Sequence, residues 1–526
     1  MVDVLPTDSF AAGIAEARSQ VSAGNVAAAI EILGRLIRGR PGNPEALRLL
    51  GSLAERLNKP EDAASVYRVL VQADPSNPEH LRALGHALEK ARDWKGVEEC
   101  RRKQLAHAPA DYDAWISLAD SLHKQERFHH ALEVLETVRK IFPGDHRPLL
   151  KAASFYRDRN RYQAAEAICK PLVRDHPADP DVWISAGVNH HAMERNDEAE
   201  ACFRRALDID PSSVNGHFAL AFHVLSLGRW REGFEEFRWC TKLAEVAADL
   251  AAMPEWTGGE PPGTRVIVWS GQGYGDAIQF LRHVRNIAAN GHKPVLYIPR
   301  ALVRLAETVA GAASVHASAD PRPDGNVQIA LHNLPHAVGV RDPGETWPGP
   351  YLTPPPQPVL PRSGKLAVGL TWAGRPDFAN DSNRSIPLSA LAPLLDVPGI
   401  QWFGLQTGKR ASEAAGTPWA EALHDLSPRI TDFADTAALV GGLDLVISVD
   451  TSVAHLAGAL GKPVWILLPR RCDWRWLRHG ASTGWYPSAR LFRQATFGYW
   501  APVVAEMAEA LAAMAETRHQ SAPLGA

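Results

Sequence analysis

The sequence predicts an α solenoid in its first half and an α/β module of two lobes in its second half. The chain has 526 residues, which is enough for about three domains. In the first half, prolines and small residues recur at a constant step of about 34 residues, as in helical repeats. In the second half, apolar β-branched runs alternate with helical patterns, which indicates parallel sheets covered by helices. We expect domains at residues 1–247, 248–360 and 361–526.

The repeats are visible in the positions of two kinds of residue. One set consists of evenly spaced prolines, namely Pro41, Pro75, Pro109, Pro143, Pro177 and Pro211. The other set consists mainly of small residues with the same step, namely Ala29, Ala63, Val97, Ala131, Ala165, Ala199 and Gly233. Small side chains let two antiparallel helices approach closely, and a proline ends the second helix. The pattern resembles the tetratricopeptide repeat and predicts about seven units between residues 9 and 247.

Composition and charge argue against several kinds of partner. The formal net charge is −3 and no block of like charges occurs, so neither nucleic acid nor an anionic membrane is an expected partner. No apolar run has the length of a transmembrane helix, and residues 1–10 lack the basic start and apolar core of a signal peptide. The five cysteines are scattered without a CxxC pair, which favours a reduced, cytoplasmic setting.

A repeat solenoid is expected to present an inner surface lined by the first helix of each pair. One column on that surface, again with the step of the prolines, reads Glu55, Glu89, His123, Arg157 and His191. We expect His123, Arg157 and His191 to line a groove for a polypeptide; an ordinary solvated face is the alternative. The histidine doublets at residues 129–130 and 190–191 have no third ligand at a suitable spacing, so no metal site is expected.

The second half is expected to fold as two lobes of alternating strands and helices. The first lobe should contain strands at residues 265–269, 294–298 and 326–330 and helices at residues 277–289 and 301–309. A stiff, proline-rich connector follows at residues 354–361. The second lobe should contain strands at residues 366–372, 401–405, 445–449 and 464–468 and a final helix at residues 501–515, with frayed residues from 518 onward.

Residues 444–469 carry the clearest functional signal. A buried strand at residues 445–449 stops at Asp450, Thr451 and Ser452, three residues that favour the start of a helix. The helix that follows, at residues 453–460, is rich in small residues and can therefore lie close to the sheet. A strand, a polar turn and a tightly packed helix form the anion-binding unit of an open α/β sheet. This stretch therefore predicts a site for an anionic ligand.

The first lobe offers a glycine-rich loop after its first strand. Its glycines permit close approach of the backbone, and Asp276 is expected in the first turn of the next helix, facing the crevice between the lobes. A residue that only compensates the helix dipole is the alternative for Asp276. A dinucleotide site is disfavoured, because the third glycine comes one residue early and the next strand ends in Pro299 and Arg300 rather than in an acid.

Several motifs together resemble a known family. They lie at residues 271–284, 368–395, 403–408, 444–469, 473–477 and 484–494. The chain resembles bacterial tetratricopeptide-repeat glycosyltransferases, whose C-terminal part is similar to glycosyltransferase family 9, the heptosyltransferases. The resemblance implies a GT-B fold of two Rossmann-like lobes. It also implies inverting transfer of a sugar from a nucleotide-sugar substrate, with no cofactor and no essential metal.

The resemblance also implies roles for individual residues. Asp276 matches the catalytic base, and Gln272, Gly273 and Gly275 would form the loop on the acceptor side. Arg384 matches a basic residue that faces the donor phosphates. The remaining donor-side candidates of the turn are Asp450, Thr451, Ser452, the N–H groups ahead of Val453, and His455. Gln406, Trp372 and Gly374 are added because they lie at the ends of strands of the second lobe and should therefore face the crevice. Asp450 would cap its helix, bind the donor sugar or do both.

For some of these residues a purely structural role is the alternative. Arg384 would otherwise be a surface charge, and His455 would otherwise be a packed core histidine. For Trp474 and Trp476 we expect packing rather than stacking on a nucleobase.

Two departures from the family pattern bear on function. Gly271 stands where these enzymes commonly carry glutamate, and Tyr274 stands where they usually carry leucine. Because Asp276, Arg384 and the turn at Asp450, Thr451 and Ser452 are retained, the first hypothesis is a cytoplasmic transferase that glycosylates Ser or Thr of a protein captured by the repeats, with flagellin as a candidate. The alternatives are a scaffold whose degenerate transferase module binds nucleotide sugar, and a transferase that acts on a glycan.

Overall fold

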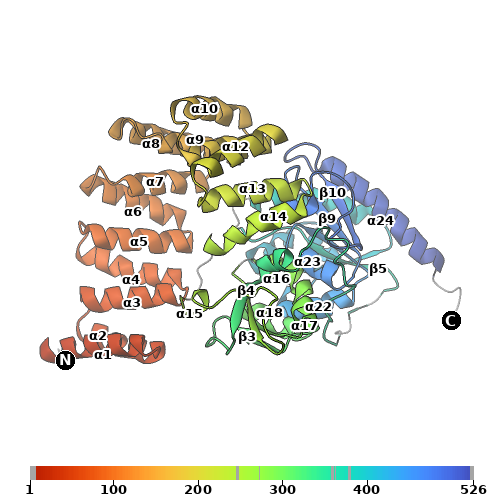
Figure 1. Cartoon of the computed structure of the whole chain (residues 1–526), viewed down its shortest axis with the longest axis horizontal. Helices are drawn as coiled ribbons and strands as arrows, with labels where there is room; N and C mark the ends of the chain where they lie inside the picture. The colour runs from red at the N-terminus through yellow and green to blue at the C-terminus, as the bar shows by residue number, and fades with distance from the viewer. Residues whose placement is uncertain are drawn as a thin grey trace. The chain divides into compact units, whose positions relative to one another are not determined.

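The computed structural model describes residues 7–243, 248–271, 273–356, 360–361, 363–376 and 381–521. Its backbone forms two compact units, Met1–Leu172 and Val173–Ala526. The first unit is entirely helical where it is described, and the second combines helices with two sheets (Figure 1). This is the predicted fold class, a helical-repeat solenoid followed by an α/β module.

The first unit consists of helix pairs that follow the predicted period. Its helices are α1 (Thr7–Ser22), α2 (Val26–Gly39), α3 (Pro44–Arg56), α4 (Pro60–Ala73), α5 (Pro78–Ala91), α6 (Trp94–His107), α7 (Tyr112–Lys124), α8 (Phe128–Ile141), α9 (Arg147–Asp158) and α10 (Tyr162–Asp175), the last of which runs across the unit boundary. Asn43 shows how a helix starts here, since its side chain accepts the N–H groups of Glu45 and Ala46. Gly51 shows why a small residue recurs, since a Cβ there would overlap the ring of Tyr67.

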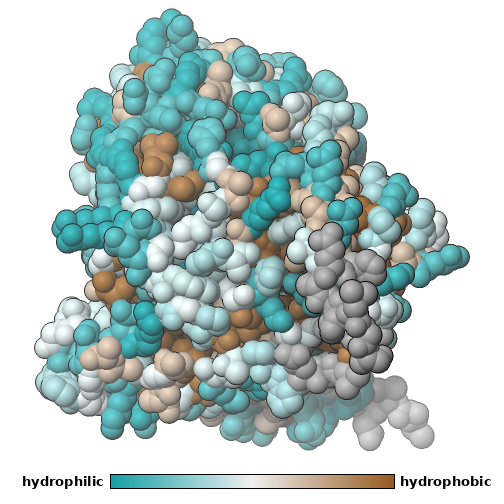
Figure 2. Space-filling view, turned by 90° about the vertical axis from the view of Figure 1, so that its right-hand side faces the viewer, coloured by the Kyte–Doolittle hydropathy of each residue, from teal (hydrophilic) through white to brown (hydrophobic). Residues whose placement is uncertain are grey.

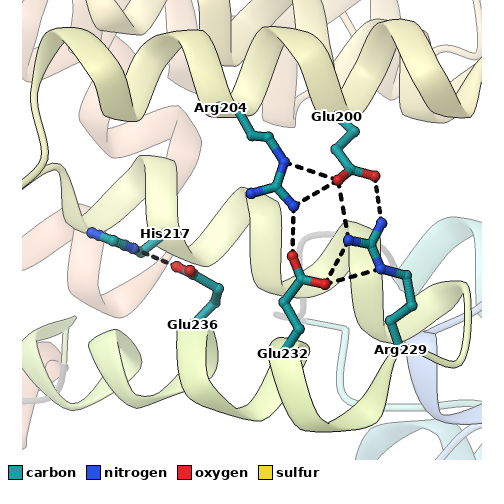
Figure 3. A network of polar contacts seen from close by, with 6 residues as sticks. All are labelled: Glu200, Arg204, His217, Arg229, Glu232 and Glu236. Carbon is teal, nitrogen blue, oxygen red and sulfur yellow. Dashed lines mark hydrogen bonds and ion pairs between the residues drawn. The ribbon is translucent and has the colours of Figure 1, made fainter.

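The last two repeats belong to the second unit. They comprise α11 (Pro180–Ala192), α12 (Asn196–Ile209), α13 (Val214–Ser226) and α14 (Trp230–Phe237), followed by η1 (Arg238–Leu243) and α15 (Ala248–Ala251). Two arginines and two glutamates link these helices, because Glu200 of α12 and Glu232 of α14 both pair with Arg204 and with Arg229 (Figure 3). Each glutamate thus has two cationic partners, and the network holds the final repeats together.

The first lobe contains a four-stranded parallel sheet of order β3-β2-β1-β4. Its strands are β1 (Arg265–Trp269), β2 (Lys293–Ile298), β3 (Ser314–Ala317) and β4 (Val327–Ala330). Its helices are α16 (Tyr274–Phe280), η2 (Leu281–His283), α17 (Val284–Ala289), α18 (Arg300–Ala306), η3 (Leu331–Asn333) and α19 (Leu334–Ala337). Three strands were predicted and β3 was not. The predicted helix at residues 277–289 is instead three shorter segments.

The second lobe contains a six-stranded parallel sheet of order β10-β9-β8-β5-β6-β7. Its strands are β5 (Leu366–Thr371), β6 (Ile400–Gly404), β7 (Leu423–Asp425), β8 (Leu445–Val449), β9 (Val464–Leu468) and β10 (Ala489–Arg493). Its helices are α20 (Asp381–Arg384), η4 (Leu388–Asp396), η5 (Gly408–Ala414), α21 (Trp419–Ala422), η6 (Ser427–Arg429), α22 (Phe433–Gly441), α23 (Ser452–Ala459), η7 (Trp474–Trp476) and α24 (Ala501–Ser521). Helix α24 continues through residue 518, where fraying was expected.

The two lobes and the last repeat share one hydrophobic core within the second unit. That core includes Val268 and Ile278 of the first lobe and Trp474 and Trp485 of the second. Phe234 of α14 packs edge-on against both tryptophans, with ring centroids 5.9 and 6.2 Å apart. The compact units therefore divide at Leu172, whereas the sequence suggested a boundary at residue 247, because these aromatic contacts join the final repeats to the α/β module.

The surface view agrees with the balanced composition of the chain. Hydrophilic residues cover most of the face in Figure 2, and the hydrophobic residues on it form small separate areas. Within the described residues, no helix combines the length and the apolar character that crossing a membrane requires.

Candidate active site

Two helices that begin at sheet edges meet between the lobes. Helix α16 follows β1 of the first lobe, and α23 follows β8 of the second. Their close approach depends on Gly275, because a Cβ there would lie 2.8 Å from Cδ2 of His455 and 3.7 Å from Cα of Ser452. The glycine loop and the polar turn that the sequence singled out are therefore brought together, although they are far apart in the chain.

Asp276 lies at the first turn of α16, as predicted. Its Oδ2 accepts the backbone N–H of Gly273 at 3.2 Å, and its Oδ1 lies 2.5 Å from Nη2 of Arg475 in the other lobe. The side chain keeps 28% of its surface exposed. Burial raises the pKa of Asp276, the positive charge of Arg475 lowers it, and Asp473 adds to the increase, with a net shift upward. Asp276 is thus a carboxylate of increased basicity held by a cation.

Arg475 connects the lobes and was not among the predicted site residues. It is buried, and its guanidinium donates to Oε1 of Gln279 at 2.5 Å and to Asp473 at 2.8 Å, in addition to its contact with Asp276. It also stacks on the ring of Trp474 at 4.0 Å. The sequence signal that could have found it is weak, because it consists of one arginine between two tryptophans.

Asp450 adds a third carboxylate to this neighbourhood. Burial first, and then the negative charge of Asp473, raise the pKa of Asp450 to about 6. The residue does not cap α23, because the N-cap is Thr451 and no side chain bonds there. Of the two alternatives for Asp450, the structure therefore does not support the helix cap. The hydroxyl of Thr451 lies 2.9 Å from that of Ser448.

Arg384 lies beside the start of α23. Its Nη1 donates to the backbone carbonyl of Asp450 at 3.1 Å, and its Nε donates to Asp381 at 3.2 Å. Asp381 is only 3% exposed and also pairs with Arg410 at 3.1 Å, so a buried anion holds two arginines. A Cβ on Gly374 would overlap the guanidinium of Arg384 in its present position. The structure thus brings Arg384, Gly374 and the α23 turn together.

Three other donor-side candidates are buried and bonded within the protein. Oε1 of Gln406 accepts the N–H groups of Trp372 at 3.2 Å and of Ala373 at 3.0 Å. Trp372 is buried and its indole donates to Glu413. Nδ1 of His455 lies 2.9 Å from the hydroxyl of Tyr486, and its ring stacks on Trp476. The prediction that Gln406 and Trp372 face the crevice is corrected, because both side chains are buried and form hydrogen bonds within the second lobe.

His455 matches its core alternative. It is buried, and burial, followed by the charge of Arg475, lowers its pKa well below the ordinary value. Trp474 and Trp476 are fully buried and pack in the core, as expected. Ser452 and Val453 open α23, and Val453 also packs against the core. Gly273 is exposed at the start of α16, and Gln272 lies outside the described residues.

The predicted groove residues take three different positions. His123 is 9% exposed, stacks on Phe155 at 4.1 Å and lies 3.1 Å from Asp158, so the prediction that it lines an open groove is wrong. Arg157 is partly exposed. In the second unit, Nδ1 of His191 lies 2.8 Å from Arg478 and 2.9 Å from His223, so His191 joins α11 to the loop after η7 instead of lining a groove.

The first unit contains two hollows at equivalent positions two repeats apart. One measures about 420 Å³ and includes Leu81, Leu84 and Leu88 in its lining. The other measures about 400 Å³ and has Leu149, Ala152 and Tyr156 at the corresponding positions. In the described residues, no group of three or more His, Cys, Asp and Glu has a metal-binding arrangement.

Sequence profiles of two families match the chain. The tetratricopeptide-repeat profiles match residues 14–78, 122–186 and 180–213. The profile of glycosyltransferase family 9 (heptosyltransferase) matches residues 407–467, which include β8 and α23. The chain therefore combines tetratricopeptide repeats with a family 9 glycosyltransferase segment, which confirms the resemblance read from its motifs.

One curated relative and two solved structures complete the comparison. Protein FlbA of Caulobacter vibrioides is 29% identical over 329 residues, which cover 56% of this chain and 54% of FlbA, so the match spans about half of that relative. A tetratricopeptide-repeat protein of Parabacteroides merdae is 17% identical and covers 46% of this chain and 95% of its own, with a TM-score of 0.37. A tetratricopeptide-repeat protein of Thermus thermophilus is 23% identical and covers 34% of this chain and 97% of its own, with a TM-score of 0.28.

Proposed function

We propose that this protein transfers a sugar from a nucleotide-sugar donor to a Ser or Thr hydroxyl of a protein held by the repeats. The observation that carries the proposal is the meeting of α16 and α23. It brings a carboxylate of increased basicity, Asp276, towards a helix start flanked by Arg384. The carboxylate suits proton removal, and the helix start suits an anionic leaving group. The family 9 profile match, which includes the start of α23, supports the same assignment.

The proposed reaction is a single displacement. The acceptor oxygen attacks the anomeric carbon and forms the new glycosidic bond, while its proton passes to the carboxylate of Asp276. The bond between the anomeric carbon and the phosphate oxygen breaks, and its electron pair leaves with the nucleoside diphosphate. A single displacement inverts the anomeric configuration. The charge of Arg475 favours the ionised form of Asp276 and so keeps the base ready to accept a proton.

The charge of the leaving group is assigned to Arg384 and to the first turn of α23. The N–H groups at Ser452 and Val453 lie at the positive end of the helix dipole. Because protein groups supply this charge, we propose that the reaction needs neither a metal nor another cofactor. Transfer in the presence of EDTA should then equal transfer without it.

The acceptor is proposed to bind along the repeats, with flagellin as the candidate that the family resemblance suggests. Tetratricopeptide arrays present extended surfaces for polypeptides. The two hollows of the first unit, whose linings combine apolar and charged side chains, are the places where acceptor side chains would insert. We assign the reaction to the cytoplasm, in keeping with the five cysteines, all of which are free thiols.

The first test is a thermal-shift screen of the full chain against nucleoside diphosphates and nucleotide sugars. A ligand that binds the folded state raises the melting temperature according to its concentration relative to its dissociation constant. We expect one base to give a clear increase that the Arg384→Ala variant loses. No increase with any ligand of the panel would contradict the proposal.

A non-catalytic scaffold is the second candidate, and two observations favour it. Gly271 replaces the glutamate of similar enzymes, and both carboxylate oxygens of Asp276 already have partners. Such a scaffold would bind the nucleotide but release no nucleoside diphosphate when nucleotide sugar and acceptor protein are mixed. Measurement of that release separates the two functions.

A further inference from the structure

His332 is a buried histidine whose nitrogens bind nothing that the structure describes. The residue is 2% exposed, and within the described part of the chain neither Nδ1 nor Nε2 has a hydrogen-bond partner. A buried polar group left without a partner destabilises the folded state. Such groups are rare in folded proteins, and a functional role is one of the explanations for them.

His332 follows strand β4, and this position places it beside the candidate active site. Strands β1 and β4 are neighbours, and Trp269 pairs with Ala330 at their carboxyl ends. Ser270 follows the first strand and His332 follows the second, so both lie at the edge from which α16 and Asp276 begin. The buried hydroxyl of Ser270 likewise has no partner in the described residues.

Aromatic rings hold His332 without using its nitrogens. The ring of Phe237 meets it edge-on at 5.9 Å, and that of Trp269 does so at 6.3 Å. Phe237 ends α14 of the last repeat, and η1 follows directly. Cys240 of η1 is fully buried, and burial and then the charge of Asp276 raise the pKa of its thiol to about 12. Phe237 and Cys240 of this end of the repeats belong to the hydrophobic core that also contains Ala277 and Ile278, the residues after Asp276.

We propose that His332 binds the acceptor hydroxyl that attacks the donor, an inference that rests on the transferase function proposed above. A neutral imidazole has one N–H donor and one acceptor nitrogen. If the N–H donates to the acceptor oxygen, the hydroxyl proton stays available for Asp276. The two residues would then divide the work, with His332 positioning the oxygen and Asp276 removing its proton.

The electrostatic surroundings keep the imidazole in the form that this role requires. Burial first, and then the positive charge of Arg475, lower the pKa of His332 to about 4. The ring is therefore neutral at physiological pH.

The first arm of the test measures stability. A His332→Phe variant replaces two unpartnered polar atoms by an apolar ring, so we expect its melting temperature to rise above that of the wild type. A structural histidine that is satisfied by bound water would instead lose its hydrogen bonds, and the melting temperature would fall by several degrees. That fall would overturn the inference. His332→Asn, which keeps hydrogen-bonding capacity, guards against a misfit of the larger ring.

The second arm measures transfer from the donor that the nucleotide screen identifies. N-acetylserinamide and N-acetylthreoninamide test a protein hydroxyl, and methyl glycosides test a glycan hydroxyl. For whichever probe the wild type uses, His332→Phe should raise the acceptor KM at least tenfold, leave the donor-induced thermal shift unchanged and be partly rescued by Asn. The matched control is His283→Phe, since His283 is also 2% exposed with an unpartnered buried Nε2 but lies in η2.

The outcomes separate the two proposals. An unchanged acceptor KM in His332→Phe overturns the role of His332 while the transferase function stands. No transfer by the wild type to any probe, or to a protein captured by the repeats, overturns the transferase function and with it the inference. An equal loss in His283→Phe would show a general packing effect and would also overturn the inference.

Discussion

The two sides of the crevice use charge in opposite ways. In the first lobe a carboxylate, Asp276, is held by a cation that comes from the other lobe. In the second lobe a cation, Arg384, is held by Asp381, a buried anion of its own lobe. The first arrangement joins the two lobes, because Arg475 of the second lobe reaches Asp276 of the first. The second arrangement is complete within the second lobe.

Under the proposed function, this difference assigns different steps to the two lobes. The base, Asp276, is set by a contact between the lobes. The phosphate site around Arg384 is built within the second lobe. Variants on the two sides should therefore change different kinetic constants.

Asp276→Asn should give the largest effect. The amide cannot accept the acceptor proton, so kcat should fall by about 10²–10⁴-fold. Donor binding, measured as the nucleotide-induced thermal shift, should stay near the wild-type value because Asp276 belongs to the other lobe. The matched control is Asp473→Asn, which also removes a partner of Arg475 but leaves Asp276 in place. Comparable turnover in Asp276→Asn would remove this residue from the role of base.

Arg475→Met should shift the pH dependence of turnover. Arg475 lowers the pKa of Asp276, so its removal raises that pKa further, and the acid limb of the pH–rate profile should move to higher pH. We also expect a loss in kcat of about 10–100-fold and lower stability, because two carboxylates lose their partner. Arg475→Lys retains the charge and should return the acid limb towards its wild-type position. An unmoved limb in the Met variant would show that Arg475 has only a packing role.

Arg384→Ala should act on the donor alone. Hydrogen bonds to charged groups contribute about 1.5–3 kcal/mol each, so the dissociation constant for the nucleoside diphosphate should rise by about 10–100-fold. Titration calorimetry would measure this change. Arg490→Ala is the charge-matched control, since Arg490 pairs with Glu506 on β10 and α24. Equal affinity in the two variants would contradict the phosphate role of Arg384.

Asp450→Asn should give the smallest effect, visible only in stability. The pKa of Asp450 is raised to about 6, above the unfolded value, so the folded state favours the protonated carboxyl. The stability from this group is complete below the unfolded pKa and is lost as pH rises through about 6. At pH 8 the free energy of unfolding of the variant should therefore exceed that of the wild type by on the order of 1–3 kcal/mol, and its melting temperature should be a few degrees higher. At pH 4 the two proteins should differ little. Melting curves at the two pH values are the measurement, and an equal difference at both would refute the assignment.

Much of the fold could be predicted because its signals are local. The regular step of the prolines located the helix pairs, and β-branched runs located strands such as β1, β5, β8 and β9. Strand β3, with the sequence SVHA, is half-buried and has no clear alternation, and β10 carries an arginine at each of two positions. Such short or charged strands take their place from pairing with a neighbour, which residue spacing does not reveal.

The candidate site divides in the same way. Asp276, Gly275 and Gly374 could be predicted, because glycines and polar residues that follow strands mark places of close approach. Arg384 was found only through the family resemblance. Gln406 and Trp372 were misjudged. Their position at strand ends suggested the crevice, but their hydrogen bonds to the loop and to Glu413 turn them inward. His123 was likewise assigned to a groove, although it packs on Phe155.

The sequence by itself determined the repeat period, most strands and the two helix starts, because these depend on the order of small, apolar and polar residues along a short stretch. Only the tertiary structure decided that Arg475 holds Asp276, two residues 199 positions apart in the chain. It also decided that the last repeat packs into the core of the transferase module. The physical reason is that charge pairing and burial depend on distances in space, which no local spacing of residues specifies.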